Sequence, residues 1–538
     1  MPDEAANREC ELKFKARSSD LKKFKQIASA IPGDTTPWSL AELSSQYFDT
    51  KDGRLAKRGV SVRVRLSNGQ SAQTVKTSAI GRNGLMNRNE WEQPSAQSVP
   101  DLSALPADAR RAIGMVIDGE LVPVIKVDVT RQSMTIRRDT MPGPALVVDV
   151  AIDQGIISAG GKTAPVAECE LELVQGDLAS FFQLASEIHA ACPLHLSNTA
   201  KSERGFRLMH GGNAQVHWAP KFDLRRNQCI HQALAKIFST SIGNIIDNED
   251  VCLTHKDPEG VHQMRVSIRR LRSSLKVFGH LIEPSRRSWM VKDLKWLHSC
   301  LGPPRDWDVY VEETLGSIDG SGIDKASFAK LRQGAQRERR AAYRRLRGAL
   351  RSERYARLIF RLTAFTALEG WQTRPLDSDH PLLQPLKKTA TKTLRRPYRK
   401  LLKSAHNLAE QDMAARHQVR IQLKRLRYAV DFLDGAYAAD EAKTFIRMLR
   451  QLQDEFGHIN DVAQAVRLTD ELTHSEDKAR AQEAVTFAAG QVRGWYARIL
   501  QESDTRLIAN WDAFAATRPF WEIKTPPSGS HGGAYTKL

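Results

Sequence analysis

The sequence has little of what marks several large protein classes. Aromatic residues make up only 7% of the 538 residues, and no RRM, KH, helix-turn-helix or zinc-finger pattern occurs, which argues against sequence-specific nucleic-acid recognition. The six cysteines form no CxxC pair, so we expect buried, reduced thiols. No apolar run approaches membrane-spanning length, and the N-terminus Met-Pro-Asp-Glu lacks an apolar secretion core. These absences predict a cytoplasmic protein without a membrane partner.

Positive charge, in contrast, is in excess and unevenly distributed. The chain has 80 Lys and Arg against 62 Asp and Glu, a formal net charge of +18. Residues 1–210 hold 26 basic and 25 acidic residues, so almost all of the excess lies beyond them. A chain of this length can form two or three domains with substantial cores. We expect one domain at 1–210, a linker at 211–221, a basic domain at 222–512 and a disordered tail at 526–538.

The N-terminal domain begins with strict alternation. A β-strand over residues 9–17 would place Glu9, Glu11 and Lys13 on one face and apolar residues on the other. The run Glu168-Cys-Glu170-Leu-Glu172 repeats the pattern. Carboxylates so close together need water, bound cations or Lys and Arg partners. Further runs with one charged face contain Arg63 and Arg65, Thr74 and Lys76, Arg88, Glu90 and Glu92, Arg131 to Arg137, and Asp149 and Asp153.

Two arrangements fit these strands. An open sheet would turn its charged face to solvent, which is the simpler interpretation of any single run. A closed antiparallel barrel would collect the charges in a polar lumen and bury its apolar outside under helices. The number of such strands favours the barrel, and amphipathic stretches near 20–31, 101–113 and 178–191 are the expected covering helices.

The order of these runs resembles the CYTH family of triphosphate tunnel metalloenzymes over about residues 7–208. The resemblance rests on Glu9-x-Glu11-x-Lys13, Tyr47-Phe-Asp-Thr50, Arg63-Val-Arg65, Arg88-Asn-Glu90-Trp-Glu92, Asp149-Val-Ala-Ile-Asp153-Gln-Gly155, Glu168-Cys-Glu170-Leu-Glu172 and Lys201-Ser-Glu-Arg-Gly205. It implies an eight-stranded antiparallel tunnel that binds a triphosphate through Lys and Arg, with Mg²⁺ or Mn²⁺ held by glutamates.

The residue chemistry agrees with that implication. A linear triphosphate needs a cage of basic side chains, and Arg can bind two of its oxygens at once, while a metal draws charge from the phosphorus. The expected cage is Lys13, Arg63, Arg65, Lys76, Arg131 and Lys201. The expected metal ligands are Glu9, Glu11, Glu170 and Glu172, with Glu168, Asp149 and Asp153 as further candidates and Glu90 and Glu92 in the catalytic set. Tunnel carboxylates also suit ion pairs with Lys and Arg, and Asp153, close to Gly155, also suits a turn.

The C-terminal part contains an internal repeat. The run His262-x-x-Arg265-x-x-x-Arg269-Arg270-Leu-Arg272 matches His417-x-x-Arg420-x-x-x-Lys424-Arg425-Leu-Arg427 at a spacing of 155 residues. The same spacing relates Gly302 to Gly457 and Asp306 to Asp461. A constant register predicts two similar helical units, at about 222–370 and 377–512. On helices, the basic residues form stripes, and the expected polyphosphate-binding residues are His262, Arg265, Arg269, Arg272, Lys276, His417, Arg420, Lys424 and Arg427.

The repeat resembles the CHAD domain, the conserved-histidine α-helical domain, over about residues 222–512. A second signal is Leu301-Gly-Pro-Pro-Arg305-Asp306-Trp-Asp308, from which the second copy departs at Phe456-Gly457-His-Ile-Asn460-Asp461. The resemblance implies two helical bundles that bind inorganic polyphosphate. An extended basic track suits such a polyanion, and the basic stretches 337–357 and 387–403 either lengthen it or simply face solvent. The two histidines suit phosphate or structural hydrogen bonds better than a metal.

The sequence thus predicts a cytoplasmic inorganic triphosphatase that uses Mg²⁺ or Mn²⁺, and whose basic domain binds polyphosphate, with polyphosphate granules as a candidate location. Three alternatives stay open: a non-catalytic polyphosphate-binding protein, nonspecific nucleic-acid binding, and a tunnel that acts on thiamine triphosphate or, as an adenylate cyclase, on ATP. The many metal-type carboxylates favour hydrolysis over binding alone. No residue pattern identifies a base or thiazole pocket.

Overall fold

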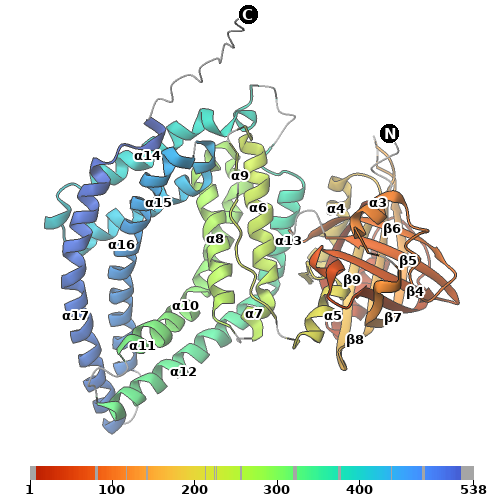
Figure 1. Cartoon of the computed structure of the whole chain (residues 1–538), viewed down its shortest axis with the longest axis horizontal. Helices are drawn as coiled ribbons and strands as arrows, with labels where there is room; N and C mark the ends of the chain where they lie inside the picture. Colours follow the sequence, from red (N-terminus) through yellow and green to blue (C-terminus); the bar gives the residue numbers. More distant parts are fainter. Residues whose placement is uncertain are drawn as a thin grey trace, which may run out of the picture.

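The computed structural model combines an N-terminal β-rich domain with a C-terminal helical domain (Figure 1). It describes residues 8–78, 83–116, 118–140, 143–212, 214–222, 224–225, 227–254, 257–318, 324–372, 377, 379–437, 439–474 and 479–522. The tail expected at 526–538 lies outside these ranges. None of the described helices is both long enough and apolar enough to cross a lipid bilayer.

The β-rich domain is a closed antiparallel barrel of eight strands. They are β1 (Arg8–Lys15), β3 (Ser39–Thr50), β4 (Val60–Ser67), β5 (Gln70–Thr77), β6 (Leu85–Ser95), β7 (Leu121–Arg138), β8 (Leu146–Ala159) and β9 (Lys162–Gln175). Around the barrel they follow the order β1-β6-β5-β4-β3-β7-β8-β9, and β9 pairs back with β1. Two short strands, β2 (Asp34–Thr35) and β10 (His195–Leu196), pair with β7 and β1. Closure confirms the barrel interpretation and rules out the open sheet.

Two hairpins of the barrel have turns that the sequence dictates. Asn68 and Gly69, between β4 and β5, have φ of 49° and 82°. Gly160 and Gly161, between β8 and β9, have φ of 55° and 72°. Two successive residues with positive φ match the twist of flanking strands and favour Asn and Gly, so these dipeptides set the register of two strand pairs.

Helices bury the outer face of the barrel, as the amphipathic stretches predicted. The covering helices are α1 (Ser18–Ala30), α3 (Ala107–Ile113) and α4 (Leu178–Ala191), with a short α2 (Arg54–Lys57) before β4. The outward residues of β1, β8 and β9, such as Leu12, Val150 and Leu171, are fully buried in a core that also contains residues of α1 and α4. Period-2 alternation therefore separates an apolar outside from a polar inside.

One end of the barrel interior is apolar, which the alternation did not predict. Leu43, Tyr47 and Val129 border the interior cavity and belong to a buried cluster against which α5 (Lys201–Met209) packs through Phe206 and Met209. The helix approaches β7 closely, because a Cβ on Gly205 would stand 2.4 Å from a methyl carbon of Ile125. Helix α5 therefore closes this end of the interior.

The helical domain shows the predicted repeat. Its helices are α6 (Ile230–Asp247), α7 (Glu249–Thr254), α8 (Glu259–Val277), α9 (Pro284–Cys300), α10 (Gly302–Val309), α11 (Leu315–Ile318), α12 (Lys325–Leu350), α13 (Glu353–Ala367), α14 (Leu386–Ser404), α15 (Met413–Leu433), α16 (Ala439–His474) and α17 (Ala479–Ala516). A π-helical segment, Tyr310–Thr314, joins α10 to α11. Short 3-10 turns occur at Asp118–Glu120, Gly279–Leu281, Pro381–Leu383, Leu408–Glu410, Asp434–Ala436 and Phe520–Glu522.

The repeat register pairs α6 with α14, α8 with α15 and α12 with α17. The first copy breaks into α9 and α10, where Pro303 and Pro304 follow Gly302. The second copy has His458 and Ile459 at the matching positions and continues as the single helix α16. Proline removes a helical hydrogen bond and clashes with the preceding turn, which explains this difference between the copies.

The two domains share one apolar core. A continuous cluster of buried residues runs from Phe14 of β1 and Phe182 of α4 to Phe238 of α6 and Phe360 of α13. The Phe14 and Phe360 rings lie 6.5 Å apart between centroids. A second core inside the helical domain joins α10 and α12 to α16 and α17. The change in composition after residue 210 therefore does not coincide with a gap between cores.

We predict opposite effects for alanine at two helical glycines. Gly205→Ala should lower the thermal unfolding midpoint, because overpacking a buried contact costs about 1–3 kcal/mol. Gly348→Ala on α12 is the matched control, since no atom lies within 4 Å of its added Cβ and alanine favours a helix by about 1 kcal/mol. Circular dichroism melting of both variants checks this, and a Gly205→Ala variant as stable as Gly348→Ala would contradict the close packing of α5.

Candidate functional site

The barrel interior contains a cavity of about 340 Å³, which we call the tunnel. All six cations of the expected cage line it, as do most of the expected carboxylates. Its charged lining residues are Glu9, Glu11, Lys13, Arg63, Arg65, Lys76, Arg88, Glu90, Glu92, Arg131, Asp153, Glu170, Glu172 and Lys201. Charges of both signs in a low-dielectric interior must be paired to be tolerated, so the pairing decides how the tunnel is organised.

The first cluster of ion pairs lies between β1, β5 and β6. Arg88 faces Glu9 across the β1–β6 pairing, and its guanidinium donates to Glu9 at 2.6 Å and to Glu11 at 3.1 Å. Lys76 lies 2.8 Å from Glu9 and 2.7 Å from Glu90. Although burial acts to raise it, Lys76 and Arg88 hold the pKa of Glu9 far below its ordinary value. The Glu9 carboxylate is therefore ionised and fixed in place.

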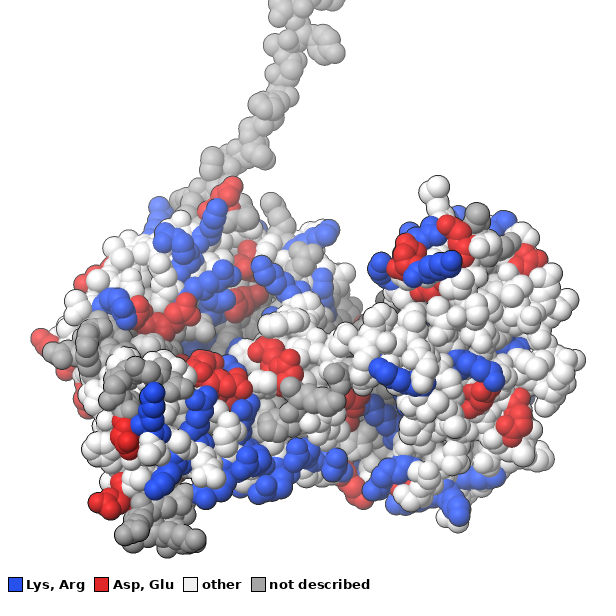
Figure 2. All heavy atoms as spheres, turned by 60° about the horizontal axis from the view of Figure 1, so that its bottom comes forward, with Lys and Arg blue, Asp and Glu red and all other residues white. Residues whose placement is uncertain are grey.

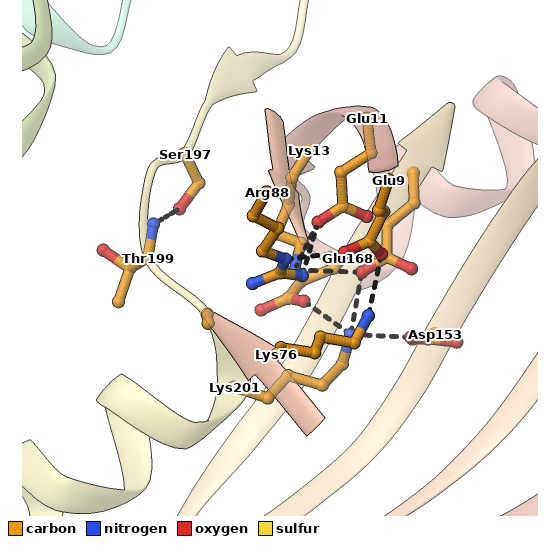
Figure 3. A network of polar contacts seen from close by, with 12 residues as sticks. Glu9, Glu11, Lys13, Lys76, Arg88, Asp153, Glu168, Ser197, Thr199 and Lys201 are labelled. Carbon is orange, nitrogen blue, oxygen red and sulfur yellow. Dashed lines mark hydrogen bonds and ion pairs between the residues drawn. The ribbon is translucent and has the colours of Figure 1, made fainter. Parts of the chain in front are cut away.

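The second cluster lies between β7, β8, β9 and the start of α5. Lys201 reaches Asp153 at 2.7 Å and both Glu168 and Glu170 at 2.9 Å. Arg131 donates two hydrogen bonds to Asp153, at 2.6 and 2.7 Å, and one to Glu170 at 2.6 Å. In Figure 3, Lys76 points toward Glu9, and Lys201 points toward Asp153 and Glu168. Asp153 lies within β8, so its role here is an ion pair rather than a turn.

Two expected carboxylates lie off the tunnel lining. Asp149 is exposed and accepts a hydrogen bond from Thr135 at 2.6 Å. Glu168 is buried, but besides Lys201 it binds Arg204 of α5 at 2.6 Å. Neither lines the cavity, so the structure places both at its periphery.

Arg65 is the exception among the cations. Its buried Nε has no hydrogen-bond partner, and among the described residues no carboxylate forms an ion pair with it. Burial, together with the positive charge of Arg63 and Arg131, lowers the pKa of its guanidinium to about 10. Tyr47 and Glu92 offset this effect only in part, so this part of the tunnel carries a cation that makes no ion pair within the described residues.

Glu172 is the matching exception among the carboxylates. In the described part of the chain it makes no ion pair or hydrogen bond, and it faces Glu11 across the β1–β9 pairing. Burial and the negative charge of Glu9, opposed in part by Lys76, raise the pKa of Glu172 to about 7, with smaller effects of Glu11 and Glu90. The tunnel thus has a positive pole at Arg65 and a negative pole at Glu172.

The negative pole fits a hard divalent cation. Within the described residues no three Asp, Glu, His or Cys side chains are close enough to form a ready-made metal cluster, because Lys and Arg hold most of the carboxylates. Glu172 nevertheless offers carboxylate oxygens, which Mg²⁺ and Mn²⁺ prefer, where extra positive charge would relieve repulsion from Glu9 and Glu11. The expected ligand set of Glu9, Glu11, Glu170 and Glu172 stays a prediction, and within it Glu170 is engaged by Lys201 and Arg131.

Three side chains in or beside the tunnel were not among the expected site residues. Arg88 shares its face with Glu90 and Glu92, so alternation alone could have placed it in the tunnel. For Arg204, only helical spacing could have pointed to the site, because it follows Lys201 by three residues on α5 and so lies on the same side of the helix. Tyr47 lies where the apolar end meets the charged part, and although burial acts to raise it, Arg63 and Arg65 hold its pKa below the ordinary value.

In the helical domain the two basic stripes converge. Helices α8 and α15, which carry them, pack against each other, and the Arg269 guanidinium lies 5.8 Å from the ring centre of Tyr428. Burial, with Arg420 and Arg269, lowers the pKa of Lys424 to about 8. Burial, with Arg265 and Arg272, lowers the pKa of His298 on α9 to about 4. We call Arg265, Arg269, Arg272, His298, Arg420 and Lys424 the central basic cluster.

The remaining expected residues differ in burial and in their contacts. His262 is half-buried next to Arg305, whereas its repeat partner His417 is exposed. Arg427 pairs with Asp431 at 2.7 Å, and Lys276 lies near Arg272 and Arg425. His298 was not among the expected residues, because it lies outside the repeated run.

Exposed basic residues extend over the outside of the helical domain. Figure 2 views the side that is at the bottom of Figure 1, where α12 runs, and shows Lys and Arg gathered across it. The exposed basic residues of α12 are Lys325, Lys330, Arg337, Arg340, Arg344 and Arg345. Basic side chains of α14, such as Lys387, Lys400 and Lys403, are exposed as well.

Comparisons with known proteins agree with both halves of this description. The CYTH domain model matches residues 7–206 and the CHAD domain model matches residues 236–470. An uncharacterised protein of Mycobacterium tuberculosis (strain CDC 1551 / Oshkosh) is 26% identical over 480 residues, which cover 84% of this chain and 88% of that protein. An inorganic triphosphatase of Haemophilus influenzae is 25% identical over 188 residues, 34% of this chain and 52% of that protein.

Among solved structures, the CHAD domain of the plant Ricinus communis matches with 30% identity and a TM-score of 0.46, covering 57% of this chain and 96% of that one. The two family models together cover most of the chain, in the order that the barrel and the repeated helices follow. This chain therefore joins an N-terminal CYTH domain to a C-terminal CHAD domain.

Proposed function

We propose that the tunnel hydrolyses inorganic triphosphate with the help of Mg²⁺ or Mn²⁺. The observation that carries this proposal is the pair of poles, Arg65 and Glu172, which line one cavity and make no ion pair within the described residues. A triphosphate bound to a divalent cation has negative oxygens for the first pole and positive charge for the second. The similarity of the tunnel domain to an inorganic triphosphatase supports the same reaction.

The side chains divide into two groups by role. Arg63, Arg65 and Arg131 bind and orient the phosphate chain, since guanidinium groups match pairs of phosphate oxygens. Glu9, Glu11 and Glu172 are the carboxylates that would hold the cation, which when bound supplies positive charge to the phosphate oxygens. Lys13, Lys76 and Lys201 keep the carboxylates ionised and compensate charge that develops on the leaving group.

An organic triphosphate is the second candidate, and one observation favours it. A side pocket of about 120 Å³ adjoins the tunnel and shares Lys76 and Arg88 with it, while Met86 and Phe206 give it apolar walls. A neutral ring attached to the phosphate chain would fit such a mixed surface. Comparing kcat/KM for inorganic triphosphate, thiamine triphosphate and ATP separates the candidates, and a protein that binds all three without turnover would be a binding protein only.

For the helical domain we propose binding of inorganic polyphosphate. The central basic cluster offers closely spaced cations whose mutual repulsion a polyanion would relieve, and the exposed residues of α12 and α14 would lengthen the contact. Nonspecific nucleic acid is the competing ligand, because its phosphates would be attracted by the same charges. We place the protein in the cytoplasm, with polyphosphate granules as a candidate location.

The first prediction concerns the positive pole. Arg65→Met should raise KM for triphosphate at least about tenfold, the equivalent of about 1.4 kcal/mol of binding energy. The same change should not lower the thermal unfolding midpoint, because it removes a half-buried cation that makes no ion pair within the described residues. Arg138→Met, which breaks an ion pair with Glu187 on the outside of the barrel, is the control and should leave KM unchanged. An unchanged KM together with a lower midpoint would make Arg65 a structural residue.

A second prediction concerns the negative pole. Glu172→Gln keeps the size of the side chain but removes its charge, so the Mg²⁺ or Mn²⁺ concentration for half-maximal turnover should rise about tenfold or more, the range typical when groups that support a metal are lost. Glu187→Gln on α4 is the matched control and should have no effect. Metal titrations of triphosphate hydrolysis test this, and identical curves for the wild type and Glu172→Gln would exclude Glu172 as a ligand.

The third prediction is a pH dependence of polyphosphate binding. A bound polyanion favours protonated Lys424 and so raises its pKa above the value of about 8 in the free protein. Below pH 8, Lys424 is protonated both in the free protein and in the complex, so its titration does not change the affinity. Above pH 8 the free protein loses the proton that the complex keeps, so the affinity should fall by up to about tenfold per pH unit.

Lys424→Arg is the test of that assignment, because arginine stays charged throughout this range. The variant should bind with a nearly flat profile between pH 8 and pH 10. Lys400→Arg on the exposed face of α14 should keep the slope of the wild type. Polyphosphate affinities measured across this pH range at constant ionic strength test the assignment. If the affinities of the wild type and Lys424→Arg change equally with pH, Lys424 is not part of the binding site.

A further inference from the structure

The segment that leads into the tunnel is held by the helical domain. Strand β10 pairs with β1 at Leu196 and His195, and His195 Nδ1 lies 3.2 Å from Glu249 of α7. The next residue, Ser197, donates its backbone N–H to the carbonyl of Lys13 at 2.9 Å. Four residues after Ser197, Lys201 begins α5 and enters the tunnel. Figure 3 shows this segment, with Ser197 and Thr199, beside the tunnel charges.

Asn198 lies at the centre of this segment and is buried, with 6% of its surface exposed. Its Oδ1 accepts a hydrogen bond from the backbone N–H of Gly84 at 2.9 Å, immediately before β6. Its Nδ2 donates to Asp247 at 3.1 Å and to the carbonyl of Gly243 at 3.5 Å, both on α6. One side chain thus joins the segment before Lys201, the strand that carries Arg88, and the helical domain.

The tunnel end of this connection is short and stiff. Asn198 precedes Lys201 by three residues, and the Glu203 side chain caps the start of α5 by accepting from the backbone N–H of Ala200 at 3.1 Å. Lys201 then meets three carboxylates within 2.9 Å. A displacement at Asn198 would therefore move the start of α5, and with it the backbone of Lys201, relative to Asp153 and Glu170.

The helical end is equally well defined. Asp247 is the last residue of α6, and Ser267 of α8 donates to Asn244 on the same helix at 2.8 Å. Asn244 and Asn248 also bind the carbonyl of His217 from the connecting segment. The C-terminal end of α6 is therefore fixed from several sides and is a suitable anchor.

We propose that Asn198 is a positioning residue, through which Asp247 of the helical domain holds Lys201 in the geometry that triphosphate turnover requires. The proposal rests on the hydrolysis proposed above. It assigns the helical domain a part in the tunnel reaction that does not depend on polyphosphate. Groups that a hydrogen bond holds in place can lose about a hundredfold in rate when they move by 1 Å.

The test exchanges the two partners. Asn198→Asp puts a carboxylate against Asp247, so charge repulsion replaces the hydrogen bond, and kcat for triphosphate should fall at least about tenfold. Asp247→Asn alone still accepts from Asn198 and should stay close to wild type. The double variant Asn198→Asp with Asp247→Asn restores a donor and an acceptor in reversed order, and it should recover most of kcat. A merely structural role of Asn198 would not predict this recovery.

Stability and binding are measured on the same full-length proteins. Asp308→Asn is the control, because it weakens buried contacts with Arg339 and Tyr343 inside the helical domain and should lower the unfolding midpoint without changing kcat. An Asn198→Asp variant with unchanged kcat would overturn the proposal, as would a double variant no more active than the single one.

The two proposals fail in different ways. If the wild type binds triphosphate in calorimetry but does not hydrolyse it, the proposed hydrolysis is wrong. The positioning contact then still predicts weaker triphosphate binding by Asn198→Asp and recovery in the double variant, because Lys201 also lines the binding cavity. Equal affinities of all three variants would overturn the contact itself.

Discussion

The structure depends on the cost of placing many charges inside a closed sheet. Alternation along β1, β4 and β9 sends every second side chain inward, and the sequence puts Lys, Arg, Asp and Glu at those positions. Such charges are tolerated only when opposite signs meet at hydrogen-bond distance. The contacts of Arg88 with Glu9 and of Lys201 with Asp153 satisfy that requirement. The apolar outer faces that result are what draw α1, α4 and the helical domain onto the barrel.

The two residues outside this pairing explain why the tunnel is more than a structural core. Arg65 and Glu172 are half-buried, make no ion pair within the described residues and lie near charges of their own sign, which makes the ionised form of each unfavourable in the free protein. Proteins keep such unfavourable groups mainly at functional sites. A ligand that carries both signs of charge would compensate both residues at once, which neither a metal nor a phosphate chain would do alone.

The alternation and the repeat in the sequence were sufficient to predict the barrel, the covering helices, the helical repeat and most of the tunnel lining. Sequence patterns could not predict which charges pair, because the pairing depends on how the barrel closes. The β1–β9 register sets Lys13 opposite Glu170 but Glu11 opposite Glu172. Alternation also could not separate Asp149, which is exposed, from Asp153, which is buried. The apolar end under α5 and the convergence of the two basic stripes require contacts between distant segments, which local periodicity does not report.

The same strand that carries charged residues into the tunnel also joins the two domains. One face of β1 carries Glu9, Glu11 and Lys13, and the other carries Phe14, which packs beside Phe360 of α13. The Phe360 ring in turn stacks on His189 of α4 at 4.2 Å between centroids. Removing the helical domain would expose the back of this strand and would take away the partners of Lys15, His195 and Asn198. The geometry of the tunnel charges is therefore a property of the whole chain, even though the residues that line the tunnel all come from its first 202 positions.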